Sequence, residues 1–208
     1  TLVATSLVEV RPVPALTGGA DWARLQQLSS ATVTGAEHLL QTRHTAPPAG
    51  VRSLAAAAVS ATSTPAETAQ RILHQVGESM EYVQGVTGVT TNAAQAWAKR
   101  KGVCQDITHI ALGALRSVGI PARYVSGYLQ PKADAEIGES VEGESHAWLE
   151  WFDGVWHGFD PTNDIEIGDR HVLVGRGRDY TDVAPLRGVY SGEGASHLFV
   201  SVQIIRES

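Results

Sequence analysis

The chain has 208 residues, 43% of them hydrophobic and 18% charged, which predicts one globular domain with a sizeable core and room for a cleft. The formal net charge is −6 and the Lys and Arg residues are scattered, which argues against nucleic-acid binding because phosphate recognition needs concentrated basic residues. No apolar run is long enough to span a membrane and no signal-peptide pattern opens the chain, so we expect a cytoplasmic protein without membrane contact.

The N-terminal residues predict a strand over 2–10 that ends before Pro12. An isolated strand at a terminus usually belongs to a sheet that is completed elsewhere. We therefore interpret residues 1–14 as the remnant of an upstream β domain and assign 15–208 to the main domain. The chain begins without methionine, as a processed product would.

Helices are predicted through the first half of the chain. Residues 21–61 are rich in Ala and Leu with Gly and Pro breaks, which is typical of short helices joined by loops. Thr64-Pro65-Ala66-Glu67 can form a capping box, and apolar residues then recur at helical spacing as far as Val83. Two more helices are predicted over 92–100 and 104–118.

The second half of the chain predicts strands at 123–129, 145–151, 155–160, 172–174 and 198–205. Helices followed by sequential strands indicate an antiparallel sheet with the helices on one side, an α+β fold. The polar loop predicted at 131–145 carries five acidic side chains against one lysine. We interpret it as a solvated loop, with a preference for cationic substrates as the alternative.

Cys104, the single cysteine, is predicted at the first turn of a helix. A single cysteine cannot form an internal disulfide or a thiolate zinc site, and we expect no metal or other cofactor. A helix N-terminus stabilises a thiolate and can also bind the oxyanion that forms when a carbonyl is attacked. The other interpretation is packing, because Cys104 lies on an apolar stripe and free cysteine is commonly buried.

His146 and Asp160 lie on the two strands of a predicted hairpin. If Phe152, Asp153 and Gly154 form its loop, His146 faces Asp160 directly, with the two Cβ atoms about 5 Å apart. An aspartate at that distance can hold an imidazole in one orientation. Taken singly, His146 fits a solvated strand residue and Asp160 a turn residue. Together with Cys104 they match a nucleophile, a base and an orienting group.

Four motifs resemble the core of bacterial transglutaminase-like cysteine peptidases over residues 65–165. They are Gly-Val-Cys-Gln-Asp at 102–106, Gly-Ile-Pro-Ala-Arg-Tyr at 119–124, His-Ala-Trp-Leu-Glu at 146–150 and Phe-Asp-Pro-Thr at 159–162. The resemblance implies a papain-like, transglutaminase-core fold with a catalytic triad of Cys104, His146 and Asp160, and a β domain upstream of the catalytic core.

The second oxyanion donor has no matching motif, because Ala98 stands where papain-like peptidases carry a glutamine. Tyr82, Gln95 and Trp97 are candidates for it, and His109 is expected to be structural. The resemblance favours hydrolysis of peptide or protein amides through a thioester. The alternatives are a transglutaminase with an amine acceptor and a non-catalytic interaction module of the same fold. The sequence does not indicate an oligomeric state.

Overall fold

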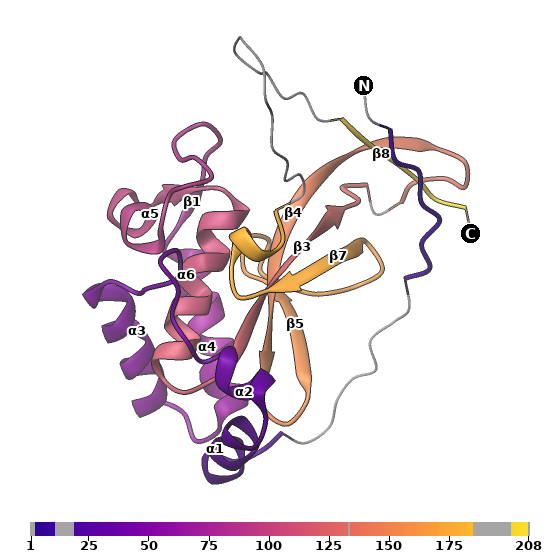
Figure 1. Ribbon diagram of the computed structural model, residues 1–208. Helices are drawn as coiled ribbons and strands as arrows, with labels where there is room; N and C mark the ends of the chain where they lie inside the picture. The colour runs from indigo at the N-terminus through magenta and orange to yellow at the C-terminus, as the bar shows by residue number, and fades with distance from the viewer. Residues whose placement is uncertain (1–2, 11–18, 133, 185–200, 208) are drawn as a thin grey trace, which may run out of the picture.

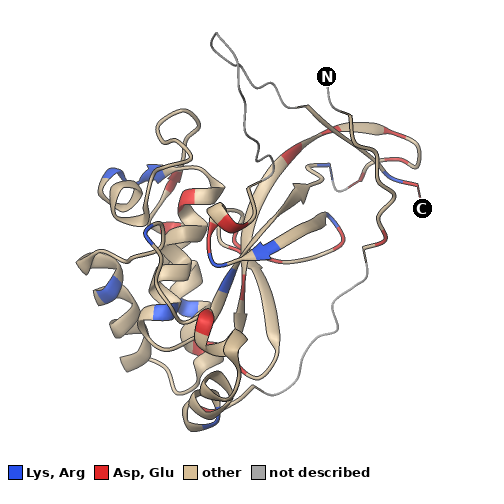
Figure 2. Ribbon diagram, viewed as in Figure 1, with Lys and Arg blue, Asp and Glu red and all other residues tan. Residues whose placement is uncertain are grey.

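A computed structural model describes residues 3–10, 19–132, 134–184 and 201–207 (Figure 1). The helices lie together on one side of a twisted antiparallel sheet, and α6 packs against both the sheet and the other helices. None of the described helices has both the length and the apolar character that crossing a membrane requires. The charged residues are spread over many elements, and Lys and Arg are as dispersed as the sequence indicates (Figure 2).

The helices follow their sequence signals closely. Thr64 caps α4 and Glu67 returns the hydrogen bond, so the predicted capping box is present. The helix bounds are α1 Trp22–Ala31, α2 Val33–Glu37, α3 Ala49–Ser60, α4 Pro65–Glu78, α5 Ala93–Lys99 and α6 Cys104–Ser117, with a short 3-10 helix, η1, at Tyr180–Asp182.

The helix predicted to continue to Val83 ends earlier, at Glu78. Residues Glu81–Tyr82 instead form strand β1, which pairs in parallel with β2 at Lys101–Gly102. The N–H of Val83 donates to the carbonyl of Gly102 at 2.8 Å, so a tertiary hydrogen bond replaces the helical one. This pairing places Tyr82 beside the residues that lead into α6.

The larger sheet has the order β6-β5-β4-β3-β7, with β8 paired to β4. Its strands are β3 Ala122–Leu129, β4 Ser140–Phe152, β5 Trp156–Asp160, β6 Ile165–Glu166, β7 His171–Gly177 and β8 Val202–Ile205. Strand β4 is longer than predicted, because residues 140–143 pair with β8 instead of forming a loop. Part of the strand predicted at 198–205 lies outside the described residues.

The register of the β4–β5 hairpin differs from the prediction by two residues. Phe152 faces Trp156, so the turn contains residues 153–155 and His146 does not face Asp160 directly. The turn is shifted because Asp153 is buried, where its carboxylate bonds to His157 at 2.6 Å and its carbonyl accepts the N–H of Ala20. A shift of two residues preserves the strand alternation, so the histidine and aspartate still share one face.

The predicted N-terminal strand is absent from residues 3–10, which form neither helix nor strand. Val3 and Leu7 are each 84% exposed, and no described strand pairs with this segment. Leu2 and residues 11–18 lie outside the described residues. The interpretation of residues 1–14 as part of an upstream domain stays a prediction.

Candidate functional site

A cavity of about 600 Å³ opens at the first turn of α6, and both Cys104 and His146 line it. Cys104 is the first residue of α6 and is partly exposed, so its thiol is accessible from the cavity and is not sealed in the core. The cavity wall also includes residues from β1, β3, β4 and η1, namely Tyr82, Tyr124, Ser126, Glu142, Glu144 and Tyr180.

The first turn of α6 is held by Asp106. Its carboxylate accepts the N–H of Val103 at 2.9 Å and the hydroxyl of Thr87 at 2.6 Å. A β-carbon on Gly102 would lie 2.7 Å from that carboxylate, so a glycine is needed where the chain enters the helix. Burial raises the pKa of Asp106 against the opposing effect of these hydrogen bonds. The contacts fix the backbone on both sides of Cys104.

His146 of β4 and Asp160 of β5 meet through a hydrogen bond of 2.7 Å between Nε2 and Oδ2. The side chain of His146 is 8% exposed and that of Asp160 is fully buried. Burial lowers the pKa of His146, but hydrogen bonds and negative charge from Asp160 and Cys104 outweigh burial and raise it to about 9. Because Asp160 occupies Nε2, Nδ1 is the ring nitrogen left for Cys104.

The Asp160 carboxylate accepts several further hydrogen bonds. Oδ1 accepts the backbone N–H groups of Thr162 and Asn163, and Oδ2 accepts the Asn163 side-chain amide at 2.7 Å. Burial disfavours the charged form, but hydrogen bonds from His146, His171 and Asn163 outweigh it and hold the pKa of Asp160 well below its usual range. The carboxylate therefore stays ionised beside His146 at neutral pH.

His171 is a member of this cluster that sequence reasoning missed. It begins β7, and its Nε2 lies 3.4 Å from Oδ2 of Asp160. The sequence predicted only a strand starting one residue later, and nothing local to His171 links it to Asp160. Their proximity depends on β7 pairing with the far side of β3, which is a long-range contact.

His146, Asp160 and His171 also form the one group of described side chains with the composition and spacing of a metal site, since their ligand atoms lie within 4.8 Å of one another. Nε2 of each histidine and Oδ2 of Asp160 already take part in hydrogen bonds within the group. An ion would have to displace both protons that point at the carboxylate. The arrangement therefore fits two imidazoles that donate hydrogen bonds to one carboxylate better than it fits a metal site.

The three sequence candidates for a second oxyanion donor separate clearly. Gln95 caps α5 through its side chain, and the indole nitrogen of Trp97 lies against Gly50. Neither residue lines the cavity, whereas Tyr82 does. The β1–β2 pairing places Tyr82 opposite Gly102. Of the three, Tyr82 is thus the residue that the structure brings to the site.

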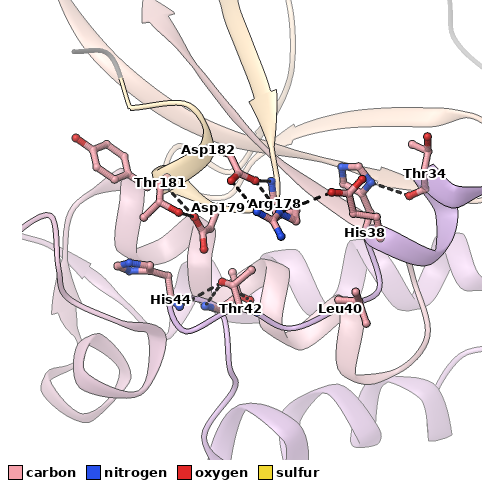
Figure 3. A network of polar contacts seen from close by, with 12 residues as sticks. Thr34, His38, Leu40, Thr42, His44, Arg178, Asp179, Thr181 and Asp182 are labelled. Atoms are coloured by element: carbon pink, nitrogen blue, oxygen red, sulfur yellow. Dashed lines mark hydrogen bonds and ion pairs between the residues drawn. The ribbon is translucent and has the colours of Figure 1, made fainter. Parts of the chain in front are cut away.

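A polar network around Arg178, Asp179 and Asp182 holds η1 against the helices (Figure 3). Tyr180 of η1 lines the cavity. Arg178 binds Asp182 at 2.8 Å, and its Nε lies 3.7 Å from the carboxylate of Glu37 in α2. His109 is fully buried and accepts the backbone N–H of Tyr180 at 3.2 Å. Burial lowers the pKa of His109 to about 3, so it is neutral, as its expected structural role requires.

The sequence is similar to a known family and to curated mycobacterial proteins. Residues 52–161 match the family model described as the transglutaminase-like superfamily. An uncharacterised protein of Mycobacterium leprae is 42% identical over 208 residues, covering 99% of this chain and 73% of that protein. An uncharacterised protein of Mycobacterium tuberculosis strain H37Rv is 34% identical over 224 residues, covering 99% of this chain and 69% of that protein.

The fold is similar to that of a solved structure, a candidate cysteine protease from Cytophaga hutchinsonii. The TM-score is 0.57 at 26% sequence identity, with 71% of this chain and 48% of the other covered. The chain thus spans about half the length of that protein. This similarity and the arrangement of helices on one side of an antiparallel sheet confirm the predicted α+β, papain-like architecture.

Proposed function

Because the chain belongs to the transglutaminase-like superfamily, we propose that Cys104, His146 and Asp160 form a catalytic triad for cysteine-dependent acyl transfer, and that the reaction is hydrolysis of amides. One observation carries this proposal. His146 lies in a cavity with the accessible Cys104, and its other ring nitrogen is held at 2.7 Å by a buried carboxylate. A packing cysteine would need neither partner.

The proposed reaction begins with an ion pair. With a pKa of about 9, His146 holds a proton at neutral pH, and the proton it takes from Cys104 leaves a thiolate. The sulfur attacks the amide carbonyl, forming a carbon–sulfur bond and an oxyanion that first-turn N–H groups of α6 would receive. As the carbon–nitrogen bond breaks, His146 gives its proton to the leaving amine, and a thioester remains.

Water completes the cycle. His146, now neutral, accepts a proton from the water that attacks the thioester, and the carboxylic acid leaves as the Cys104 sulfur is released. A primary amine in place of water would give a transglutaminase, since the acyl-enzyme is common to both reactions. The similarity to a candidate cysteine protease supports water as the acceptor. Peptides and protein amides are the proposed substrates, and the cytoplasmic location stays a prediction.

Alkylation by iodoacetamide over a range of pH tests the triad without a known substrate. We expect the thiol to react well below pH 8, and Cys104→Ser to abolish labelling. His146→Gln should move the onset of labelling to the pH of an ordinary thiol, near 8.5. His157→Gln is a matched control, because His157 makes a similar 2.6 Å contact to Asp153 on the same hairpin but does not line the cavity. An inert Cys104 in the native protein would refute the proposal and favour the interaction module.

Acyl acceptors are then separated by product analysis. The native protein is incubated with a peptide library, with and without an added primary amine, and the products are identified by mass. Hydrolysis yields free carboxylic acids in both conditions. If the main product is instead an amide of the added amine, the reaction is amine transfer and the proposal of hydrolysis is wrong. The Cys104→Ser variant should yield neither product.

A further inference from the structure

We propose that His171 is a positioning residue for the proposed reaction: a neutral imidazole, fixed in its Nε2–H tautomer, that holds the Asp160 carboxylate in line with His146. The inference rests on the proposed function. It adds a fourth residue, from a different strand, to the three that the sequence indicated. His171 does not line the cavity, so it acts through Asp160 and not on a substrate.

The tautomer follows from the hydrogen bonds of the two ring nitrogens. The backbone N–H of Gly168 donates to Nδ1 of His171 at 3.3 Å, and a nitrogen that accepts a hydrogen bond carries no proton. The ring proton therefore lies on Nε2, which is 3.4 Å from Oδ2 of Asp160 and donates to it. The N–H of His171 also bonds to the carbonyl of Gly168 at 3.1 Å, which closes the loop before β7.

Packing fixes the plane of the His171 ring. Its side chain is 1% exposed, and the ring of Trp148 contacts it edge-on at a centroid distance of 5.2 Å. Trp148 is itself 1% exposed and lies so close to β3 that a β-carbon on Gly127 would come within 2.5 Å of its ring. The imidazole therefore cannot turn away from Asp160 without disturbing the sheet.

A neutral donor suits this position better than a cation. A buried Lys or Arg would cancel the charge of Asp160 and withdraw its support from the His146 imidazolium. His171 orients the carboxylate and leaves its charge in place. The contact of Oδ2 with His146, at 2.7 Å, is the shorter of the two, as expected for a hydrogen bond between charged groups. The titratable side chains that contact Asp160 are His146 and His171.

The test compares His171→Phe with His171→Gln. Phenylalanine keeps the ring shape against Trp148 but cannot donate, whereas glutamine supplies an N–H donor. We expect His171→Phe to lower the rate constant of Cys104 alkylation at pH 6 by about tenfold, the scale on which supporting residues act. Losing a donor raises the pKa of Asp160, so the acid limb of the profile should also move to higher pH. His171→Gln should restore both readouts to within about threefold of native.

Nitrogen NMR of the native protein gives a result that does not depend on a variant folding. At neutral pH, His171 should show a protonated Nε2 and an unprotonated Nδ1 that accepts a hydrogen bond. A doubly protonated ring or the Nδ1–H tautomer would overturn the assignment, as would a folded His171→Phe variant with a native alkylation profile. An inert Cys104 in the native protein would instead refute the triad itself, so the two failures are distinguishable.

Discussion

Replacing Asp160 by asparagine should remove most of the reactivity of Cys104 without removing the side chain that fills the site. Asparagine keeps an oxygen for the N–H groups of Thr162 and Asn163, which now bond to Oδ1. Its amide then points a donor at His146, so the ring must accept at Nε2 and carry its proton on Nδ1. A protonated, neutral Nδ1 cannot take the thiol proton, so the ion pair is lost.

The size of the effect follows from the pKa of His146. The gap between 6.5 and about 9 corresponds to about 3 kcal/mol at about 1.36 kcal/mol per pH unit. Asp160 and Cys104 share this stabilisation. If Asp160 supplies between half and all of it, the variant loses about 1.5 to 3 kcal/mol, or about 10- to 150-fold in alkylation rate near pH 6.

The assay measures the rate constant of Cys104 alkylation by iodoacetamide between pH 4 and 10, for the native protein and for Asp160→Asn. A separate unfolding measurement verifies that the variant is folded. The two rate constants should converge above pH 9, where an ordinary thiol ionises without help. Parallel profiles, with equal rates at pH 6, would show that Asp160 does not support the His146–Cys104 pair. Asp160 would then not be a member of the triad.

Three further outcomes are expected. Gly127→Ala should lower the free energy of unfolding by about 1–3 kcal/mol in denaturant titrations, because a β-carbon there would lie 2.2 Å from the carbonyl oxygen of Val172 and 2.5 Å from the ring of Trp148. An unchanged midpoint would contradict this packing. Since the folded pKa of His146 is raised, its contribution to the free energy of unfolding should be complete below pH 6.5 and disappear as pH rises to about 9. His146→Gln should abolish this pH dependence, and a native free energy of unfolding that does not change with pH over this range would contradict it. Glu142 and Glu144 lie on the same face of β4 as His146 and line the cavity. Changing both to glutamine should raise the KM for cationic peptides several-fold at low salt and by a smaller factor at high salt, and should leave the KM for neutral peptides unchanged. Equal effects on cationic and neutral peptides would refute a charge preference.

Local signals predicted the helices and the position of Cys104 well. The capping box at Thr64 and the stretch from Gly102 to the end of α6 contain their own start and stop signals, so they could be assigned without tertiary contacts. The alternation of side chains along a strand is also a local signal. It placed His146 and Asp160 on one face even though the predicted pairing was two residues away from the observed one.

Features that depend on distant contacts could not be predicted in this way. The hairpin register is set by the burial of Asp153 and its bond to Ala20, more than a hundred residues earlier in the chain. His171 reaches Asp160 only because β7 pairs with β3. The end of α4 depends on β1 pairing with β2. In each case a long-range hydrogen bond determines the observed structure, and the spacing of residues in the sequence does not indicate that bond.

Strand β8 has a practical consequence for handling this protein. Residues 202–205 pair with the part of β4 that precedes His146, and a β-carbon on Gly143 would meet Ile204 at 2.6 Å. Ser201 and Val202 line the same cavity as Cys104. Deleting or replacing residues 201–205 would thus change the wall of the cavity that holds Cys104, so protein made for functional work should retain this strand.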